Sequence, residues 1–297
     1  MASPIRVGST LKNHTVSRSN DWSSTDWNRE IPETSRSIAP LMTLMPASLE
    51  FPPAAKVYAR FASLISLADQ HLEGNLGGRL VLLDSLDEAG CALSLGANIA
   101  GAALLGIDAH SERLKWGIRH GVCDFLVNHL DEALRILKNE LRKKQPASVW
   151  LEADAAKTMA EMVERGVQPD ILVVKSSQSV HILESRGALL LSDSKDLPSN
   201  EISWSVTGAP SLWLPKIDAL AAGVFEDLGD ARRRWLQYAP RYLGRAFLAQ
   251  RYTRLHPHET QRFTTLLGDK IAAGEIKVSV TLEIRRGSEL EVIELNH

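Results

Sequence analysis

The sequence predicts an α/β protein with a doubly wound parallel, Rossmann-like sheet, an irregular N-terminal arm and a helical C-terminal segment. Short apolar runs alternate with helical patterns through the middle of the chain, which is typical of parallel βαβ units. The chain of 297 residues, 44% of them hydrophobic, is also long enough to bury a large core. We expect an arm over residues 1–50, the Rossmann-like domain over 51–200, and a helical or α+β segment packed on the same body over 201–297.

The N-terminal arm is rich in Ser, Thr, Asn and Pro and shows little periodicity, so we expect it to be extended or partly disordered. Trp22 and Trp27 favour an arm that wraps over the body or over a partner, because disordered tails seldom keep aromatic residues. Regular structure begins at residues 52–74, where apolar residues recur at helical spacing and Gly74 is a plausible stop.

Five strands are expected in the Rossmann-like domain, each followed by a helix or a turn. Ser85 and Glu88 have the spacing of a capping box at the start of the first of these helices, and Ser111 is the expected N-cap of the next. The expected strands are 79–83, 101–108, 122–127, 147–153 and 169–175, and the helices between them are 85–100, 111–121, 130–144 and 154–166.

The C-terminal part is less regular. Residues 181–201 are expected to form a loop with one short strand, and a helix over 230–255 should be interrupted at Pro240, which lacks the amide that a helix interior requires. The remaining expected elements are strands at 202–208 and 276–286 and helices at 211–225 and 258–275.

Composition excludes several classes of protein. A formal net charge of -2 and a pI near 6.5 give no general attraction to nucleic acid or anionic membranes. No apolar run is long enough to span a bilayer, and the first residues lack the apolar region of a secretory signal. Cys91 and Cys123 have no metal-ligand spacing, so we expect neither a metal nor a disulfide framework. We expect a cytoplasmic protein.

Several segments, in order, resemble the urocanate hydratase (urocanase) family, whose members use a tightly held NAD as an electrophile in histidine breakdown. They include "GANIAGAALLGIDAHSERL", "AAKTMAEMVERGVQPDIL", "ISWSVTGAPSLWLPKIDAL" and "LLGDKIAAGEIKVSVTLEI". The resemblance covers roughly residues 55–285 and implies a shortened, divergent relative of a dimeric NAD enzyme.

The first βα turn departs from the family. Where the family has a run of glycines that lets backbone approach the NAD pyrophosphate, this chain reads "DSLDEAG". Asp84, Asp87 and Glu88 favour the helix dipole but repel a diphosphate, by about 3 kcal/mol for each acid within about 5 Å at an effective dielectric of about 20. Tight NAD binding is therefore not expected.

Other positions agree only in part with the family. Asp108 stands where the family has an acid for the adenosine ribose, although an Asp at a strand end also caps helices. Ser176 and Ser177 keep part of a polar signature that would face the cofactor. Ala153 and Asp154 replace a Gly-Asn pair, Val174 and Lys175 replace polar residues, and the segment with the reactive-site cysteine is missing after Val180.

Candidate ligand residues outside the resemblance are His110, Lys175 and Gln178, which follow strand ends where open α/β sheets bind ligands. His256, His258 and Glu259 could chelate a metal only from an extended turn, and a plain helix N-terminus is the favoured interpretation. Arginines interleaved with aromatic residues over 231–254 are typical of a solvated or dimer-facing helix rather than of a nucleic-acid site.

Taken together, these observations predict a urocanase-like protein that has lost urocanate hydratase activity and tight NAD binding. It would bind another small ligand or act through protein contacts, with no cofactor and no nucleic acid. An active hydratase-like lyase that holds NAD in an altered turn, and a non-enzymatic assembly protein, are the alternatives. We expect a homodimer, with the aromatic C-terminal helices as anchors.

Overall fold

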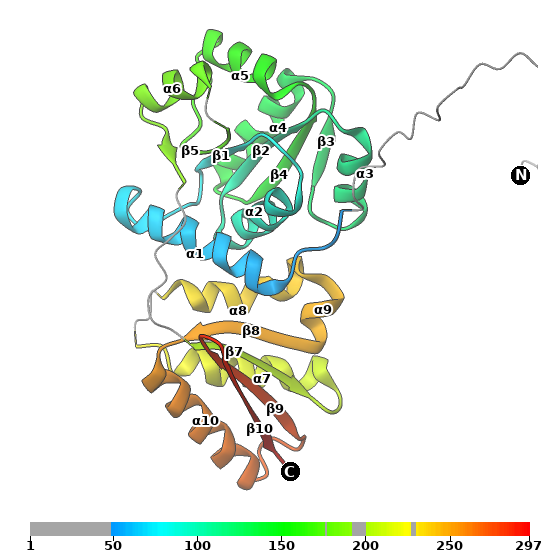
Figure 1. Cartoon of the computed structure of the whole chain (residues 1–297), viewed down its shortest axis with the longest axis vertical. Coiled ribbons are helices and arrows are strands. Elements are labelled where there is room, and N and C mark those ends of the chain that lie inside the picture. Colours follow the sequence, from blue (N-terminus) through cyan, green and yellow to red (C-terminus); the bar gives the residue numbers. More distant parts are fainter. Residues whose placement is uncertain (1–48, 176, 192–199, 227–229) are drawn as a thin grey trace, which may run out of the picture. The chain divides into compact units, whose positions relative to one another are not determined.

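Two β-sheets organise the chain in the computed structural model, which describes residues 49–175, 177–191, 200–226 and 230–297 (Figure 1). The expected N-terminal arm lies almost wholly outside the described residues.

The first sheet has six parallel strands in the order β3-β4-β2-β1-β5-β6, which confirms the predicted doubly wound, Rossmann-like fold. The sixth strand pairs with β5 and is the one short strand expected within residues 181–201. The strands are β1 (Leu80–Leu83), β2 (Ala103–Asp108), β3 (Phe125–Val127), β4 (Ala147–Glu152), β5 (Ile171–Val173) and β6 (Leu189–Leu190).

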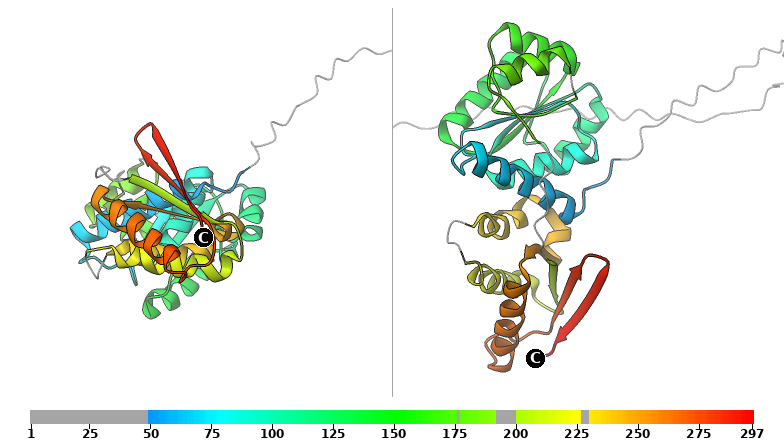
Figure 2. Two further views of the ribbon diagram at one scale, coloured as in Figure 1. Left: turned by 90° about the horizontal axis from the view of Figure 1, so that it is seen from below. Right: turned by 60° about the vertical axis from the view of Figure 1, so that its left-hand side comes forward.

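Helices cover both faces of this sheet (Figure 2). On β1, Val81 and Leu83 point into one hydrophobic core while Leu80 and Leu82 point into the other, as the two-residue period of a strand requires. The first core holds α1 (Ala54–His71), α2 (Glu88–Ala100) and α3 (Ser111–Arg119). The second holds α4 (Leu130–Lys143), α5 (Ala155–Glu164) and α6 (Gln178–Ser185), of which α6 was not predicted.

Helix α2 is enclosed on all sides from Gly90 to Ala100, where every residue is buried, whereas Glu88 and Ala89 at its amino end are exposed. Its small residues permit this enclosure. A Cβ on Gly96 would lie 3.0 Å from the backbone nitrogen of Phe61, so α1 and α2 approach closely at this glycine. At the other end of α2, the Arg234 side chain donates a hydrogen bond to the Ile99 carbonyl at 2.6 Å. This bond satisfies one of the carbonyls that a helix leaves free at its C-terminus.

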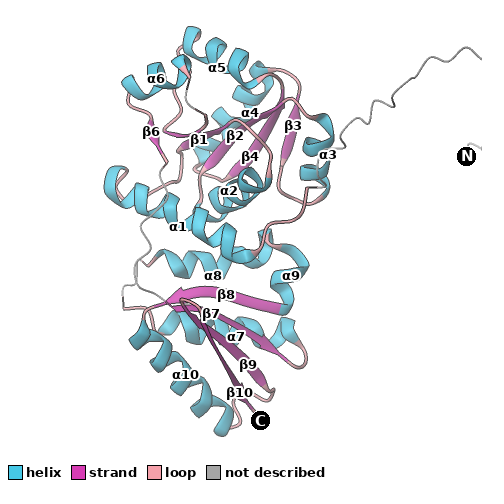
Figure 3. Cartoon of the chain, viewed as in Figure 1, coloured by secondary structure: helices cyan, strands magenta, loops and turns pink. Residues whose placement is uncertain are grey.

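The second sheet is antiparallel, in the order β10-β9-β7-β8 (Figure 3). One of its faces packs on α7 and α10, where Trp204 contacts the Phe263 ring and donates its indole N–H to Asp218. The elements are β7 (Asn200–Val206), α7 (Pro210–Gly223), α8 (Ala231–Tyr242), α9 (Gly244–Ala249), β8 (Gln250–Leu255), α10 (Pro257–Ala272), β9 (Val280–Arg286) and β10 (Glu289–Leu295).

Two predictions for the C-terminal part were wrong. The helix expected over 230–255 does not break at Pro240 but continues to Tyr242. It is followed by Gly244, whose φ of 61° lies in the left-handed region. The end of the same expected helix is strand β8, in which Arg251, Thr253 and Leu255 alternate inward. The hairpin strand β10 was also not predicted.

Gly106 supports a specific prediction about the parallel sheet. It pairs with Trp150 on the neighbouring strand, and a Cβ at position 106 would lie 2.4 Å from the indole ring. We expect Gly106→Ala to lower the free energy of unfolding by about 1–3 kcal/mol through overpacking. In the matched control Gly268→Ala, the added Cβ in α10 meets no atom within 4 Å. This control should be neutral or slightly stabilising, because alanine favours helix. Urea unfolding of both variants checks this, and equal effects would contradict it.

Candidate functional site

The carboxyl ends of β1, β2, β4 and β5 form the edge where open α/β sheets bind ligands. The strand order changes direction at β1, which lies between β2 and β5. At this point the backbone amide of Lys175 donates a hydrogen bond of 2.8 Å to Asp84 Oδ2. The Asp84 side chain therefore connects the ends of β1 and β5.

The turn from β1 into α2 is closed by carboxylates. Asp87, not Ser85, is the N-cap of α2, and it accepts a hydrogen bond of 2.8 Å from the Gly90 amide. The predicted capping box was wrong because the helix begins only at Glu88, whose side chain pairs with Lys56 of α1.

Packing requires a glycine at position 90 of this turn. A Cβ at position 90 would lie 2.0 Å from the Ser85 carbonyl oxygen. The glycine therefore serves the packing of the turn against α2, and its presence does not require the close approach of a ligand.

Asp108 connects the ends of β1 and β2. Only 3% of its side chain is exposed, and it accepts hydrogen bonds from the amides of Leu86 at 2.8 Å and His110 at 2.7 Å. Arg113 contributes an ion pair at 3.2 Å. The carboxylate thus satisfies one amide in the first βα turn and one at the start of α3, whose N-cap is His110 and not the predicted Ser111.

His110 remains the half-exposed histidine of this edge. Its Nδ1 lies 2.9 Å from Asp108 Oδ1 and 3.0 Å from the Arg113 guanidinium. A single ring nitrogen cannot donate to the acid and accept from the arginine at once. The cluster can orient the imidazole, but Arg113 competes for the atom that an Asp–His proton relay would need.

The remaining predicted residues lie beyond β5. Ser177 is the N-cap of α6, where its hydroxyl accepts the Val180 amide at 3.3 Å, and Gln178 is the exposed first residue of that helix. The exposed Lys175 ammonium has no hydrogen bond or ion pair within the described ranges. Ser176 lies outside the described residues. Asp154 is the N-cap of α5, where its side chain accepts the Lys157 amide at 2.8 Å.

The His256–Glu259 segment is the start of α10. Glu259 is 1% exposed, accepts the His256 amide at 2.8 Å and receives both Arg232 terminal nitrogens at 2.6 and 2.7 Å. Within the described part of the chain, no group of three His, Cys, Asp or Glu side chains is placed to hold a metal. The segment therefore forms the N-terminus of a helix, as predicted from the sequence.

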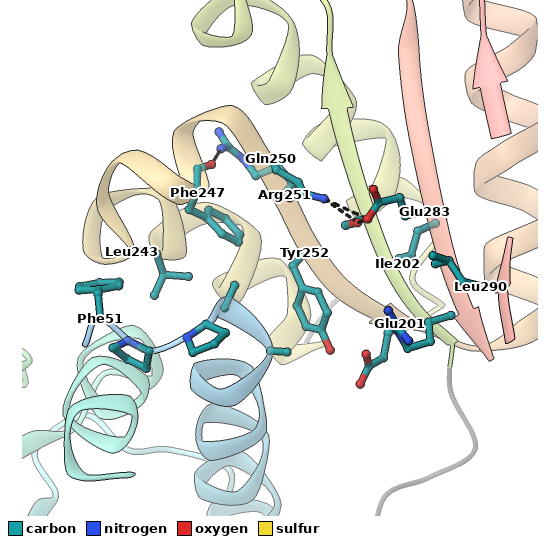
Figure 4. Close-up of a pocket in the computed structure, with 16 residues that line it drawn as sticks. Phe51, Glu201, Ile202, Leu243, Phe247, Gln250, Arg251, Tyr252, Glu283 and Leu290 are labelled. Carbon is teal, nitrogen blue, oxygen red and sulfur yellow. Dashed lines mark hydrogen bonds between the residues drawn. The ribbon is translucent and has the colours of Figure 1, made fainter. Parts of the chain in front are cut away.

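A ligand-sized cavity lies away from the sheet edge, on the second sheet (Figure 4). It has a volume of about 560 Å³, within the range of small-molecule sites. Strands β7, β8 and β9 supply polar residues, while α9 and the chain before α1 supply apolar ones. This cavity was not predicted from the sequence, because the residues of β8 have the pattern of the end of a helix.

Residues 57–184 match the family model described as the urocanase Rossmann-like domain. The match runs from α1 into α6 and includes the whole sheet edge described above. It stops before the second sheet. No helix within the described ranges is both long and apolar enough to cross a membrane.

Asp108 should contribute strongly to stability. Asp108→Asn removes the charge that pairs with Arg113 and weakens two buried hydrogen bonds donated by backbone amides. We therefore expect a loss of about 2–4 kcal/mol in the free energy of unfolding. The control Asp131→Asn removes an exposed partner of Arg165 and should leave the melting temperature unchanged. Thermal unfolding measures both. A variant at position 108 as stable as the control would show that the buried carboxylate is dispensable.

Glu259 should make the free energy of unfolding depend on pH in the acidic range. Burial by itself raises the pKa of its carboxyl, but hydrogen bonds from Arg232 and the His256 amide outweigh it, so the pKa lies below the ordinary 4.5. The stabilisation is then complete above pH 4.5 and is lost as the pH falls through the folded-state pKa. We expect Glu259→Gln to cost about 3 kcal/mol in the free energy of unfolding at pH 7, with a gap to the wild type that narrows as the pH falls below the ordinary carboxyl pKa of 4.5. Exposed Glu275→Gln is the control, and a gap independent of pH would contradict the prediction.

Proposed function

Because the chain is a relative of the urocanase family through residues 57–184, we propose that it keeps the family's sheet as a frame and has lost urocanate hydratase activity and tight NAD binding. In its place, the protein binds a different small molecule, in the cavity of the second sheet.

The occupied amides of the first βα turn carry this proposal. A pyrophosphate site needs backbone N–H groups that are free at the helix N-terminus. Here the Leu86 amide donates to Asp108 and the Gly90 amide donates to Asp87. Both acceptors are carboxylates of the chain itself, so these two amides are not free for a phosphate.

Charge supports the same conclusion. Asp84, Asp87 and Glu88 surround the turn, and a diphosphate would have to displace or approach all three. At about 3 kcal/mol for each acid at about 5 Å, their repulsion exceeds the 0.3–1 kcal/mol or so that a helix N-terminus gives an anion. The residues present do not fit NAD, and in this proposal Asp108 and Ser177 are structural residues, not cofactor ligands.

Other parts of the proposal concern partners. The aromatic anchors expected to form a dimer contact lie in the core, since Trp235 is fully buried and packs on Tyr58, Phe61 and Phe247. A homodimer stays a prediction, and exposed Val292 on β10 is a more suitable contact for it. A cytoplasmic location and the lack of nucleic-acid binding also remain predictions.

NAD binding tests the proposal directly. We expect isothermal titration calorimetry with NAD to give no heat at micromolar protein, and mass spectrometry of the denatured protein to detect no released NAD. Urocanate absorbance should stay constant when urocanate is mixed with this protein and added NAD. An active urocanate hydratase is the positive control for all three assays. A dissociation constant in the low micromolar range or tighter, or turnover of urocanate, would refute the proposal.

A further inference from the structure

The cavity on the second sheet contains two charges of opposite sign that the protein leaves unmatched. Four charged side chains line it. Glu201 pairs with Arg254 at 3.1 Å, and buried Arg251 pairs with Asp218 at 2.8 Å. The two others are Glu283 and Arg285 of β9, both exposed.

Glu283 is held in place by neutral groups. Its Oε2 accepts hydrogen bonds from the Ser203 hydroxyl at 3.1 Å and the Gln250 amide at 3.3 Å, and Gln250 also donates to Ser203 at 2.9 Å. Figure 4 shows the Gln250 side chain reaching toward Glu283. Within the described ranges no cation lies within ion-pair distance of this carboxylate. The arrangement orients a negative charge without neutralising it.

Arg285 is the complementary cation. It stands directly opposite Glu201 in the pairing of β7 with β9, but Glu201 is bonded to Arg254. The Arg285 guanidinium has no ion pair or side-chain hydrogen bond among the residues the structure describes. It is therefore available to an anionic group.

The spacing of these two charges selects a ligand with both signs close together. Residues two apart on a strand point to the same side, about 6.8 Å from each other. A zwitterion whose ammonium and carboxylate are on one carbon can span this separation, with a charge-assisted hydrogen bond of about 2.8 Å at each end.

The opposite wall of the cavity is apolar. Phe51, Leu243 and Phe247 lie across Tyr252 from Glu283 (Figure 4). Leu290 adds a half-exposed apolar surface beside the charges. A ligand that fills this space carries a hydrophobic group as well as the two charges.

We propose that the cavity binds a free α-amino acid with an apolar side chain, its ammonium on Glu283, its carboxylate on Arg285 and its side chain against Leu243 and Phe247. This assignment rests on the proposed small-molecule function and specifies the chemical class of the ligand.

The test compares three probes of one shape on the full chain. L-Phenylalanine carries both charges, phenethylamine only the cation, and 3-phenylpropanoate only the anion. We expect calorimetry to show phenylalanine binding at least tenfold more tightly than either analogue. Equal affinity for phenylalanine and one analogue, or no binding of phenylalanine at about 10 mM, would overturn the assignment.

Two variants then assign the ends of the ligand. Glu283→Gln should weaken the binding of phenylalanine and phenethylamine by tenfold or more and leave the binding of 3-phenylpropanoate unchanged. Arg285→Gln should weaken the binding of phenylalanine and of 3-phenylpropanoate. Glu294→Gln on β10 removes an acid outside the cavity and should change nothing. All three positions are exposed, and circular dichroism establishes that each variant is folded.

The two proposals fail in different ways. If neither charge variant alters the binding of phenylalanine, the ligand assignment is wrong, while the loss of NAD binding is unaffected. If NAD binds or urocanate is converted, the loss of the family's activity is wrong, whatever the cavity binds.

Discussion

The enclosure of α2 is the constraint on which much of this structure depends. From Gly90 to Ala100 this helix is buried on every side, so the polar groups of this stretch must be satisfied by protein groups or by a ligand. Asp87 and Asp108 supply acceptors at the amino end, and Arg234 supplies a donor at the carboxyl end. In the proposal made above, these carboxylates of the protein take the place of a cofactor's anion at the first βα turn.

Much of the fold could be predicted from the sequence because the strands of the parallel sheet are short, apolar and separated by helical patterns. The C-terminal half was harder to predict. Strand β8 contains Arg251 and Thr253 at buried positions, and their burial depends on partners such as Asp218 that are distant in sequence. Helix α6 has a weak signal because its N-cap, Ser177, belongs to a run of polar residues that is typical of a loop.

Prediction of the candidate sites was limited in the same way, by contacts between residues distant in sequence. The sequence predicted that acids would crowd the first βα turn, and it identified Asp108 and His110 as neighbours of that turn. It did not indicate that the Asp108 carboxylate would accept the Leu86 amide, since that contact joins two strand ends 22 residues apart. The cavity could not be predicted at all. Its charged residues come from three strands, of which one was expected to be helix.

The bond from Arg234 to Ile99 has a consequence for how such a chain can change in evolution. The segment that matches the family is not a separable module, because α8 covers it with Trp235 on Tyr58 and Phe61 as well as with this arginine. Duplicated or recombined without the second sheet, residues 57–184 would expose that aromatic surface and tend to aggregate. Substitutions on the surface of residues 57–184 that faces α8 are therefore expected to require compensating changes in α8.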